Sequence, residues 1–546
     1  MDWAQFQKPQ RYIGNEWNAV SKPHDGRLKI CLCFPDLYEV GMSNLGLRII
    51  YGLINEYESA VCERVFLPAP DLAGYLTQTG TKLFSLESKA ALDTFDVVGF
   101  HLGCELNFTN FLAVLELAGI PFEPSRRRDI IVMAGGLVNP EPIAPFVDVF
   151  FLGEFEAKAE EFMEVLKRYK GREARLEAFA HIEGFYVPAY YEVATGEGGA
   201  RLVPKTPSVQ FPLKKVHVKD LNTSYYPTRW LTPYTQIVHD RAPIEIARGC
   251  PHHCYFCQAR CVYFPYREKK TEYVLTQMEE IYASSGYENL SLLALSASHH
   301  SQIEEIIDGA GKLFKEKRVG IALPSLRVDD IVGRLYPRLA ALKKVSLTLA
   351  VEAATVELRE KINKHIDVDA VFEARDVLRS LRLRTIKLYF MFGLPGETDE
   401  DVVAIAQMIR SFQRALGVKV NASINIFIPK PFSRFQDVAM DSPENLRRKR
   451  QLIQKELGSF PLRRYHISFS TQERSFLEAV LSRAGREIAP VIFRAFVAGA
   501  RSDSCEETFR WDIWEEAFRD EKIDFRQYTT SVHPRFNPHY TAGGAV

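Results

Sequence analysis

Three cysteines in one short segment are the residues of this sequence best suited to chemistry. Cys250, Cys254 and Cys257 stand in a C-x3-C-x2-C spacing within the run RGCPHHCYFCQARC. Thiolates this close on one loop can bind three corners of an iron–sulfur cube, which leaves one iron open to a reacting ligand. A zinc site would normally need a second close cysteine pair, and none follows. We therefore predict a 4Fe-4S cluster with these three ligands.

A fourth cysteine, Cys261, extends the run to C-x3-C-x2-C-x3-C, which is close to a four-cysteine ferredoxin pattern. If Cys261 were a ligand, no iron would stay open and the protein would be an electron carrier. The barrel predicted below argues against this alternative. We expect three ligands, and we assign no role to Cys261 or to the distant Cys505.

The composition is that of an ordinary globular protein. Of 546 residues, 46% are hydrophobic and 25% charged, which excludes a disordered or fibrous chain. Nine cysteines are too few for a disulfide scaffold. The 69 basic and 69 acidic residues argue against a nucleic-acid partner but leave a local basic patch open. The start lacks a secretory pattern, and no window approaches about 20 unbroken apolar residues, so we expect a cytoplasmic protein without a membrane span.

The elements that must position these cysteines fall into two α/β regions. From 28 to 170, near-continuous apolar strands alternate with amphipathic helices. This pattern predicts a parallel sheet covered on both faces, of the doubly wound (Rossmann or flavodoxin-like) type. The five expected strands are 28–34, 62–68, 95–102, 129–136 and 147–154. Glycines follow several strand ends, where ligands of such sheets bind.

A second alternation of strands and helices runs from 239 to 440, and the cysteine run directly follows its first strand. The six expected strands are 244–248, 289–296, 319–325, 344–352, 385–393 and 420–429. They predict a partial (β/α)6 barrel of the TIM type, whose reactive site lies at the carboxyl ends of the strands. The remaining regions are an N-terminal arm (1–27), a small β appendage and linker (171–238) and a helical C-terminal region (441–546).

With these elements in place, the sequence resembles the radical SAM superfamily, whose motif is C-x3-C-x-aromatic-C, with Phe256 at the aromatic position. The resemblance implies that S-adenosylmethionine binds at the open iron. It also implies the residues that contact this cofactor: Ser296 and Ser298 near its amino group, Glu352 near its ribose, and Gly393 and Gly396 of the loop FGLPGET near its adenine.

The chemistry of that family follows from the open iron. The resemblance implies that the reduced cluster donates one electron to S-adenosylmethionine, which yields a 5′-deoxyadenosyl radical that abstracts hydrogen from a substrate. It therefore implies a low-potential electron donor, such as flavodoxin or ferredoxin, as a partner. The sequence does not identify the substrate.

The first α/β region resembles a cobalamin-binding domain. Its first loop reads D-x-Y-x-x-G, where such domains carry D-x-H-x-x-G and the histidine ligates cobalt, so Tyr38 stands in the place of the histidine. A neutral phenol is a poor cobalt ligand. The arm RYIGNEWN and the tail segment AGARSD complete a resemblance to fused proteins that join such a domain to a radical SAM barrel. The resemblance implies cobalamin near Tyr38, Gly41, Ser43, Gly103, Gly135 and Gly136.

Three functions are compatible with these features. The first is a radical SAM enzyme that uses cobalamin, with methyl transfer to an unactivated carbon as the expected reaction. The second is a cobalamin-free enzyme whose front domain docks an RNA or protein substrate. The third is a non-enzymatic iron–sulfur redox sensor.

Overall fold

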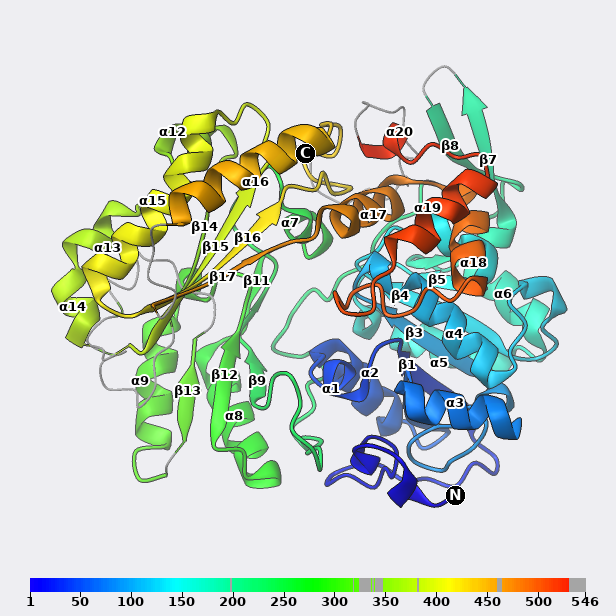
Figure 1. Cartoon of the computed structure of the whole chain (residues 1–546). Helices are drawn as coiled ribbons and strands as arrows, with labels where there is room; N and C mark the ends of the chain where they lie inside the picture. The colour runs from blue at the N-terminus through cyan, green and yellow to red at the C-terminus, as the bar shows by residue number, and fades with distance from the viewer. Residues whose placement is uncertain are drawn as a thin grey trace. The chain divides into compact units, whose positions relative to one another are not determined.

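The computed structural model describes residues 1–196, 199–317, 319–323, 335, 338, 347–380, 383–458 and 464–529. The chain divides into two compact units. The front unit comprises residues 1–240 and 480–525, and the second unit comprises residues 241–479 together with 526–529 of the described chain. Parts of two expected strands, 324–325 and 344–346, and the tail from 530 lie outside the described residues. Figure 1 shows the elements coloured along the chain.

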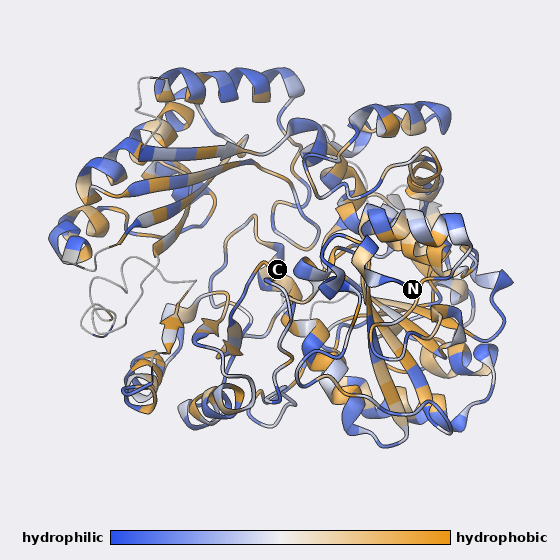
Figure 2. Cartoon of the chain, turned by 60° about the horizontal axis from the view of Figure 1, so that its bottom comes forward, coloured by the Kyte–Doolittle hydropathy of each residue, from blue (hydrophilic) through white to orange (hydrophobic). Residues whose placement is uncertain are grey.

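The front unit is built on a six-stranded sheet in the order β2-β1-β3-β4-β5-β6, parallel except for the last strand. Its strands are β1 (Leu28–Phe34), β2 (Ala60–Phe66), β3 (Val97–Leu102), β4 (Ile131–Gly136), β5 (Val149–Phe151) and β6 (Phe185–Tyr186). All five expected strands are present. Every residue of β2 is buried, as a strand covered on both faces requires. Figure 2 shows the hydrophobic colouring of these strands.

Helices cover both faces of this sheet. They are α1 (Tyr38–Gly41), α2 (Leu45–Glu56), α3 (Pro70–Thr79), α4 (Phe108–Ala118), α5 (Ala159–Arg168) and α6 (Arg172–Ala180). The five strands β2-β1-β3-β4-β5 stand in the flavodoxin-like order. The direction in which successive strands are added to the sheet reverses between β1 and β3. The loops after these two strands therefore form the edge at which a ligand of this sheet is expected.

Three further segments pack on the front unit. The arm begins with two short turns, η1 (Trp3–Gln5) and η2 (Pro9–Arg11), and the expected β appendage is the hairpin β7 (Tyr191–Gly196) and β8 (Gly199–Pro204). From the C-terminal region, α18 (Ala489–Val497) and α19 (Trp511–Asp520) contact each other, and α18 contacts α4. The last part of the chain thus returns to the first.

The second unit contains two groups of parallel strands. One has the order β13-β12-β9, and the other has the order β14-β15-β16-β17. The strands are β9 (Ala242–Glu245), β12 (Asn289–Leu293), β13 (Gly320–Ala322), β14 (Leu347–Glu352), β15 (Thr385–Phe392), β16 (Lys419–Ile426) and β17 (Tyr465–Phe469). The predicted parallel α/β fold is confirmed for both units.

Helices follow the strands of the second unit, as a barrel requires. They are α7 (Gln258–Val262), α8 (Thr271–Ser285), α9 (Ile303–Leu313), α12 (Val356–Lys361), α13 (Asp369–Glu373), α14 (Arg375–Ser380), α15 (Asp399–Leu416), α16 (Pro443–Leu457), α17 (Gln472–Arg483) and α20 (Arg526–Thr529). In Figure 1, α15 and α16 lie side by side along the four-stranded group, and these two helices contact each other.

Two details differ from the sequence prediction. The first expected barrel strand is interrupted: β9 ends at Glu245, and β10 (Ala247–Arg248) pairs instead with β11 (Arg267–Glu268) in a short antiparallel ribbon. The region after 440 was predicted to be helical, but β17 adds a strand beside β16. Only Tyr465 of this strand is buried, so it lacks the apolar run by which the other strands were predicted.

Among the described residues, no helix combines the length and apolar character needed to cross a membrane.

Candidate functional site

The three clustered cysteines lie on a loop that leaves the β10–β11 ribbon. Gly249, which precedes Cys250, has a φ of +88°. A Cβ atom at this position would lie 2.7 Å from the carbonyl oxygen of Pro265 and 2.8 Å from that of Tyr263. Because an L-residue fits neither the backbone angle nor the space, glycine is required for the turn that starts the cysteine loop.

The three thiols are partly buried and close enough to influence one another. The charges of Cys250 and Cys257 each act on the pKa of Cys254, which burial raises to about 11. Burial likewise raises the pKa of Cys250. Such thiols become thiolates when a metal displaces the proton.

No three His, Cys, Asp or Glu side chains within the described ranges converge on a single ion site. An iron–sulfur cube needs a different arrangement, because each of its thiolates binds a separate iron. The donor set of three neighbouring thiols on one loop therefore fits a cluster with an open iron, and it does not resemble a site for a single zinc ion.

Two other loops hold the cysteine loop in place. The amide of Tyr255 donates to the carbonyl of Ile362 at 3.0 Å, and the side-chain amide of Asn363 donates to the carbonyl of His253 at 2.7 Å. From the second loop, the amide of Phe435 donates to the carbonyl of Tyr255 at 3.0 Å. The cysteine loop is thus fixed through its backbone.

Phe256 serves as an apolar anchor of the same loop. It packs against a buried cluster formed by Ala353, Leu358, Ile362, Leu394 and Phe427. These residues follow the carboxyl ends of β14, β15 and β16 or belong to α12 and its C-cap. The aromatic position of the motif therefore ties the cysteine loop to the strand ends that carry the other predicted cofactor residues.

Glu352 ends β14 in an unusual backbone conformation. Its φ is +67°, and the pairing of β14 with β15 shifts between Ala350 and Glu352. A non-glycine residue with positive φ is costly and is found mainly where function requires it. Burial raises the pKa of the Glu352 carboxyl, and its charge in turn raises the pKa of Cys254. The acid predicted to face the ribose therefore lies near the cysteine loop.

Lys364 is a residue of this site that the sequence did not predict. Its ammonium group lowers the pKa of Cys250, Cys254 and Glu352, in each case against the effect of burial. It is therefore close to two thiols and to the carboxylate. Lys364 lies three residues after α12, and its amide is bonded to the carbonyl of Arg359 at 2.8 Å. No metal-ligand spacing marks a lone lysine, so only the fold identifies it.

The end of the second barrel strand also lies against the cysteine loop. The hydroxyl of Ser296 lies 3.1 Å from Nδ1 of His299 and 3.4 Å from Nε2 of His252, a residue of the cysteine loop. The two imidazole rings meet edge to face with centroids 4.2 Å apart. Ser298, the second serine predicted to contact S-adenosylmethionine, is fully buried. Ser296 is thus the serine of this pair that adjoins the predicted cluster.

The loop after β15 contains the two glycines predicted near adenine. Gly393 and Gly396 have φ angles of +80° and +71°, which favour glycine. The amide of Gly393 donates to Glu397 at 2.7 Å, and Glu397 pairs with Lys449 of α16 at 2.8 Å. The conformation of the loop is therefore supported by a buried ion pair, and the carbonyl of Gly396 accepts a hydrogen bond from Lys361 at 3.0 Å.

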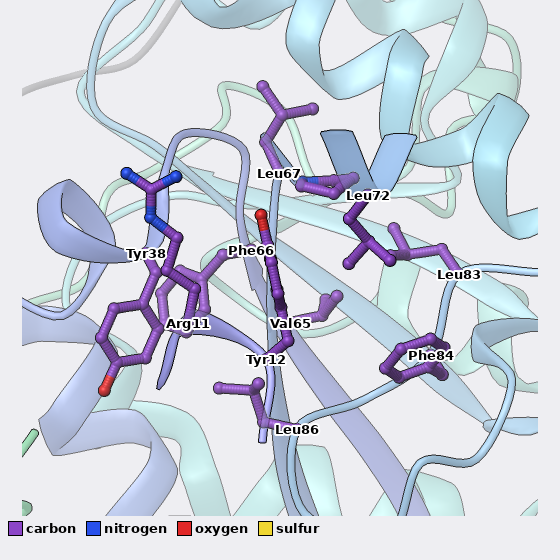
Figure 3. Close-up of a pocket in the computed structure, with 11 residues that line it drawn as sticks. Arg11, Tyr12, Tyr38, Val65, Phe66, Leu67, Leu72, Leu83, Phe84 and Leu86 are labelled. Carbon is purple, nitrogen blue, oxygen red and sulfur yellow. The ribbon is translucent and has the colours of Figure 1, made fainter. Parts of the chain in front are cut away.

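In the front unit, Tyr38 is turned toward β2 and the arm. Its hydroxyl donates to Glu16 at 2.9 Å, and its ring packs edge to face on Phe66 at 5.2 Å. Burial raises the pKa of the phenol far above its usual value. Figure 3 shows Tyr38 in the wall of a cavity of about 20 Å³, which has room for little more than one water molecule.

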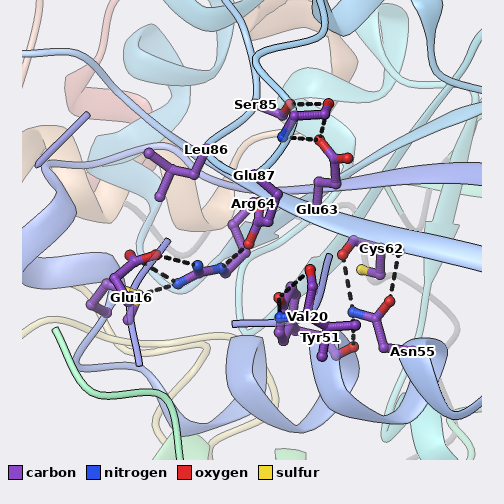
Figure 4. A network of polar contacts seen from close by, with 12 residues as sticks. Glu16, Val20, Tyr51, Asn55, Cys62, Glu63, Arg64, Ser85, Leu86 and Glu87 are labelled. Atoms are coloured by element: carbon purple, nitrogen blue, oxygen red, sulfur yellow. Dashed lines mark hydrogen bonds and ion pairs between the residues drawn. The ribbon is translucent and has the colours of Figure 1, made fainter. Parts of the chain in front are cut away.

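The carboxylate that binds Tyr38 belongs to a buried charge network. Glu16 pairs with Arg64 of β2 at 2.8 Å, and Arg64 also pairs with Glu87 at 2.7 Å (Figure 4). The opposite charge of Arg64 lowers the pKa of Glu16 despite its burial, whereas burial raises the pKa of Glu87. Tyr38 thus takes part in holding the arm to the sheet.

The other residues predicted near cobalamin have varied surroundings. A Cβ at Gly41 would lie 2.3 Å from the ring of Phe66, and one at Gly136 would lie 2.0 Å from the carbonyl of Leu102, so both glycines permit close packing. Ser43 donates to the carbonyl of Glu39 at 2.8 Å and accepts from the amide of His239 at 3.0 Å. Gly135 adjoins Phe151 and Gly103 adjoins His101, at the ends of the central strands.

A segment of the C-terminal region reaches the loops after β1 and β3. The amide of Ser502 donates to Asn110 at 2.7 Å, and Thr109 donates to Asp503 at 2.6 Å. Hydrogen bonds to Asn107 and Ser504 lower the pKa of Asp36, which burial raises more strongly. Ser504, which directly follows the tail segment AGARSD, therefore contacts Asp36, the aspartate of the D-x-Y-x-x-G loop, and the sequence alone did not predict this contact.

Models of two protein families match this chain. Residues 46–188 match the one described as "Radical SAM proteins, N-terminal", and residues 244–409 match the one described as "Radical SAM superfamily". The second match contains the cysteine loop, Ser296, Glu352 and the glycines after β15.

The relatives by sequence are of two kinds. An uncharacterized protein of Methanocaldococcus jannaschii is 25% identical over 462 residues, which cover 84% of this chain and 89% of that protein. The ribosomal protein uS12 methylthiotransferase RimO of Koribacter versatilis is 27% identical over 183 residues, 32% of this chain and 36% of that enzyme. A tRNA-2-methylthio-N(6)-dimethylallyladenosine synthase of Clostridium perfringens is 27% identical over 174 residues, 30% of this chain and 38% of that enzyme. The chain matches less than half of either of these two enzymes.

Solved structures resemble this chain in fold. The radical S-adenosylmethionine methyltransferase TsrM from Kitasatospora setae, with cobalamin and a 4Fe-4S cluster bound, has a TM-score of 0.50 at 14% identity, and the match covers 76% of each chain. The cobalamin-dependent S-adenosylmethionine radical enzyme OxsB, with aqua-cobalamin bound, has a TM-score of 0.49 at 13% identity, covering 70% of this chain and 52% of that one.

Proposed function

Because this chain is a member of the radical SAM superfamily, we propose that it cleaves S-adenosylmethionine reductively at a 4Fe-4S cluster held by Cys250, Cys254 and Cys257. The observation that carries the proposal is the arrangement around the cysteine loop. The cysteine loop packs through Phe256 on residues at the carboxyl ends of β14, β15 and β16, and Glu352 and Lys364 are near enough to Cys254 for their charges to act on its thiol. Reactive sites of such barrels lie at this end.

Different residues of this chain would hold the cluster and S-adenosylmethionine. Phe256 and the backbone hydrogen bonds hold the cysteine loop, and Glu352 would accept hydrogen bonds from the ribose. Ser296 would contact the amino group, and the loop that contains Gly393 and Gly396 would contact the adenine. When bound and reduced, the cluster supplies the electron that releases a 5′-deoxyadenosyl radical from S-adenosylmethionine. A flavodoxin or ferredoxin is the proposed electron donor.

We further propose that the front unit binds cobalamin and that the net reaction is methyl transfer to an unactivated carbon. The flavodoxin-like strand order supports a ligand at the β1–β3 edge. The overall fold, shared with a methyltransferase solved with cobalamin and a 4Fe-4S cluster, is consistent with this assignment. Fold likeness alone supports the choice of reaction.

The second candidate is a cobalamin-free enzyme whose front unit docks an RNA or protein. The methylthiotransferase relatives favour it, since their names specify a ribosomal protein and a tRNA as substrates. Their match is confined to about a third of this chain.

The test of the cluster uses the full chain, purified without oxygen, reconstituted with iron and sulfide, and reduced in the presence of S-adenosylmethionine. We expect 5′-deoxyadenosine from the wild type and from Cys261→Ala, and none from Cys257→Ala. If the reduced wild-type protein with an intact cluster forms no 5′-deoxyadenosine, the enzyme assignment is wrong and the redox-sensor alternative is favoured. If Cys261→Ala loses its cluster, the ferredoxin-like alternative is correct.

The test of cobalamin is independent of activity. The protein, supplied with hydroxocobalamin and then freed of excess, should retain about one cobalt per chain. Absence of cobalt would leave the cluster assignment intact and would favour the docking function of the front unit.

A further inference from the structure

A histidine ring lies where the strand order of the front sheet reverses. Cys33 of β1 pairs with Phe100 of β3, so the next residues, Phe34 and His101, are neighbours at the carboxyl edge. Their rings stack with centroids 5.3 Å apart and an angle of 16° between the planes. Since ligands of such sheets bind outside this edge at the reversal point, the stacked pair lines the expected ligand position.

Two glycines lie beside this ring. A Cβ at Gly46 would lie 3.7 Å from Cε1 of His101, and a Cβ at Gly103 would lie 3.5 Å from Nε2. A longer side chain at either position would reach the imidazole. Gly103 directly follows β3, and Gly46 lies in the first turn of α2.

The polar contacts of this imidazole are few. The side-chain amide of Asn44, the N-cap of α2, lies 3.3 Å from Nε2 and is the one hydrogen-bond partner of the ring within the described chain. This contact is long, and a stronger ligand of Nε2 would replace it.

Tyr38 is engaged elsewhere. Its hydroxyl is bound to Glu16 and its ring to Phe66 of the edge strand β2, on the side of the arm. A tyrosine locked in this way, with a raised pKa, is a poor substitute for the histidine of the D-x-H-x-x-G loop. His101 provides an imidazole from the neighbouring strand.

We propose that His101, and not Tyr38, is the side chain of the front unit that ligates the cobalt of bound cobalamin. The inference rests on the proposed use of cobalamin by this chain. It assigns Asn44 the role of orienting the free ring, and it gives Gly46 and Gly103 the role of keeping the approach to the ring open.

The test is the electron paramagnetic resonance spectrum of the full chain loaded with cobalamin and reduced to the Co(II) state. Protein is prepared with ordinary histidine and with ¹⁵N-labelled histidine, while the corrin stays unlabelled. We expect each cobalt line to be split into a triplet that becomes a doublet on labelling, because the axial nitrogen comes from the protein. His101→Phe, which can keep the stack on Phe34, should abolish the isotope effect, and Tyr38→Phe should leave it unchanged.

The outcomes distinguish the assignment of His101 from the proposal that the front unit binds cobalamin. If cobalt is bound but the wild-type spectrum is insensitive to labelled histidine, or if the isotope effect persists in His101→Phe, the assignment of His101 is overturned and cobalamin binding stands. If no cobalt is retained per chain, the proposed cofactor is overturned together with its ligand.

Discussion

The ammonium group of Lys364 acts directly on the carboxylate of Glu352. It lowers the pKa of that carboxyl against the effect of burial, and it does the same for the thiols of Cys250 and Cys254. The two charged residues are brought together from different elements, since Glu352 ends β14 and Lys364 follows α12. A single positive charge therefore serves both the acid predicted to bind ribose and the predicted cluster ligands.

Replacing Lys364 with methionine should make the cluster harder to reduce. Addition of an electron is favoured by a nearby positive charge, and loss of that charge should lower the midpoint potential by on the order of 50 mV at an effective dielectric constant of about 20. The measurement is a redox titration followed by electron paramagnetic resonance, with iron content checked in each sample. Lys364→Arg keeps the charge and should stay near the wild-type potential. Equal potentials for the methionine variant and the wild type would show that Lys364 does not act on the cluster.

Replacing Gly249 with alanine should displace the cysteine loop. The new Cβ would clash with the carbonyl oxygens of Tyr263 and Pro265 in addition to straining a φ of +88°. Gly286→Ala is the matched control, because Gly286 has a φ of +70° and nothing within 4 Å of the built Cβ. We expect both variants to lose a little thermal stability, by about 1 kcal/mol for the backbone strain alone. Only Gly249→Ala should lose most of its iron after reconstitution, and equal iron in both variants would contradict the steric argument.

Sequence patterns predicted the strands of the front sheet because most of their residues are buried. These strands are near-continuous apolar runs, since helices cover both faces of the sheet, and the five expected strands are all present. β17 escaped prediction because four of its five residues are at least partly exposed, and its partners in β16 lie 45 positions earlier in the chain. Short strands of this kind are determined by tertiary contacts.

The candidate site divides in the same way. The cysteine spacing is local, so Cys250, Cys254 and Cys257 could be proposed as ligands from sequence alone. Nothing in the local sequence marks Lys364 and Asn363 as site residues. They lie on a loop from another strand-helix unit, and their role depends on the packing of that loop against the cysteine loop at His253. The return of residues 480–525 to the front unit rests on contacts between residues far apart in the sequence. Examples are the rings of Phe122 and Phe493 and the ion pair of Arg486 with Glu141, which no periodic pattern reports.

The attachment of the arm should weaken in acid. Burial alone would raise the pKa of Glu39, but hydrogen bonds and charge from Arg11, at 2.7 Å, lower it below its usual value. A carboxyl whose pKa is lower in the folded than in the unfolded state stabilises the fold at pH values above its unfolded-state pKa, which is near 4.3. This contribution is lost as the pH falls through the folded-state pKa.

Arg11→Met should therefore cost about 1–2 kcal/mol at pH 7, and its deficit relative to the wild type should shrink toward pH 3.5. The measurement is the melting temperature of both proteins across this range. Arg27→Met is the control, because Arg27 lies nearby in the arm and donates to the carbonyl oxygens of Glu58 and Pro23 instead of a carboxylate. A deficit of Arg11→Met that stays constant with pH would mean that Glu39 is not its partner.

The pair of Glu141 and Arg486 should govern how firmly the C-terminal helices join the front unit. The side chain of Glu141 is fully buried, accepts hydrogen bonds from Tyr186 and from Arg486 at 2.8 Å, and has a pKa that burial raises and Arg486 lowers. Arg486→Met would leave a buried carboxylate without its counter-charge, at a cost of about 3 kcal/mol. Glu141→Gln combined with Arg486→Met removes that charge and should recover much of the loss.

Acid should rescue the single variant, because a buried carboxyl without a cation has a further raised pKa and takes up a proton on mild acidification. Melting temperatures at pH 7.5 and pH 5.5 test this. The difference in melting temperature between Arg486→Met and the double variant should be large at pH 7.5 and smaller at pH 5.5. A gap that does not change with pH would mean that the arginine stabilises the joint by packing, and that the charge of Glu141 has no part in it.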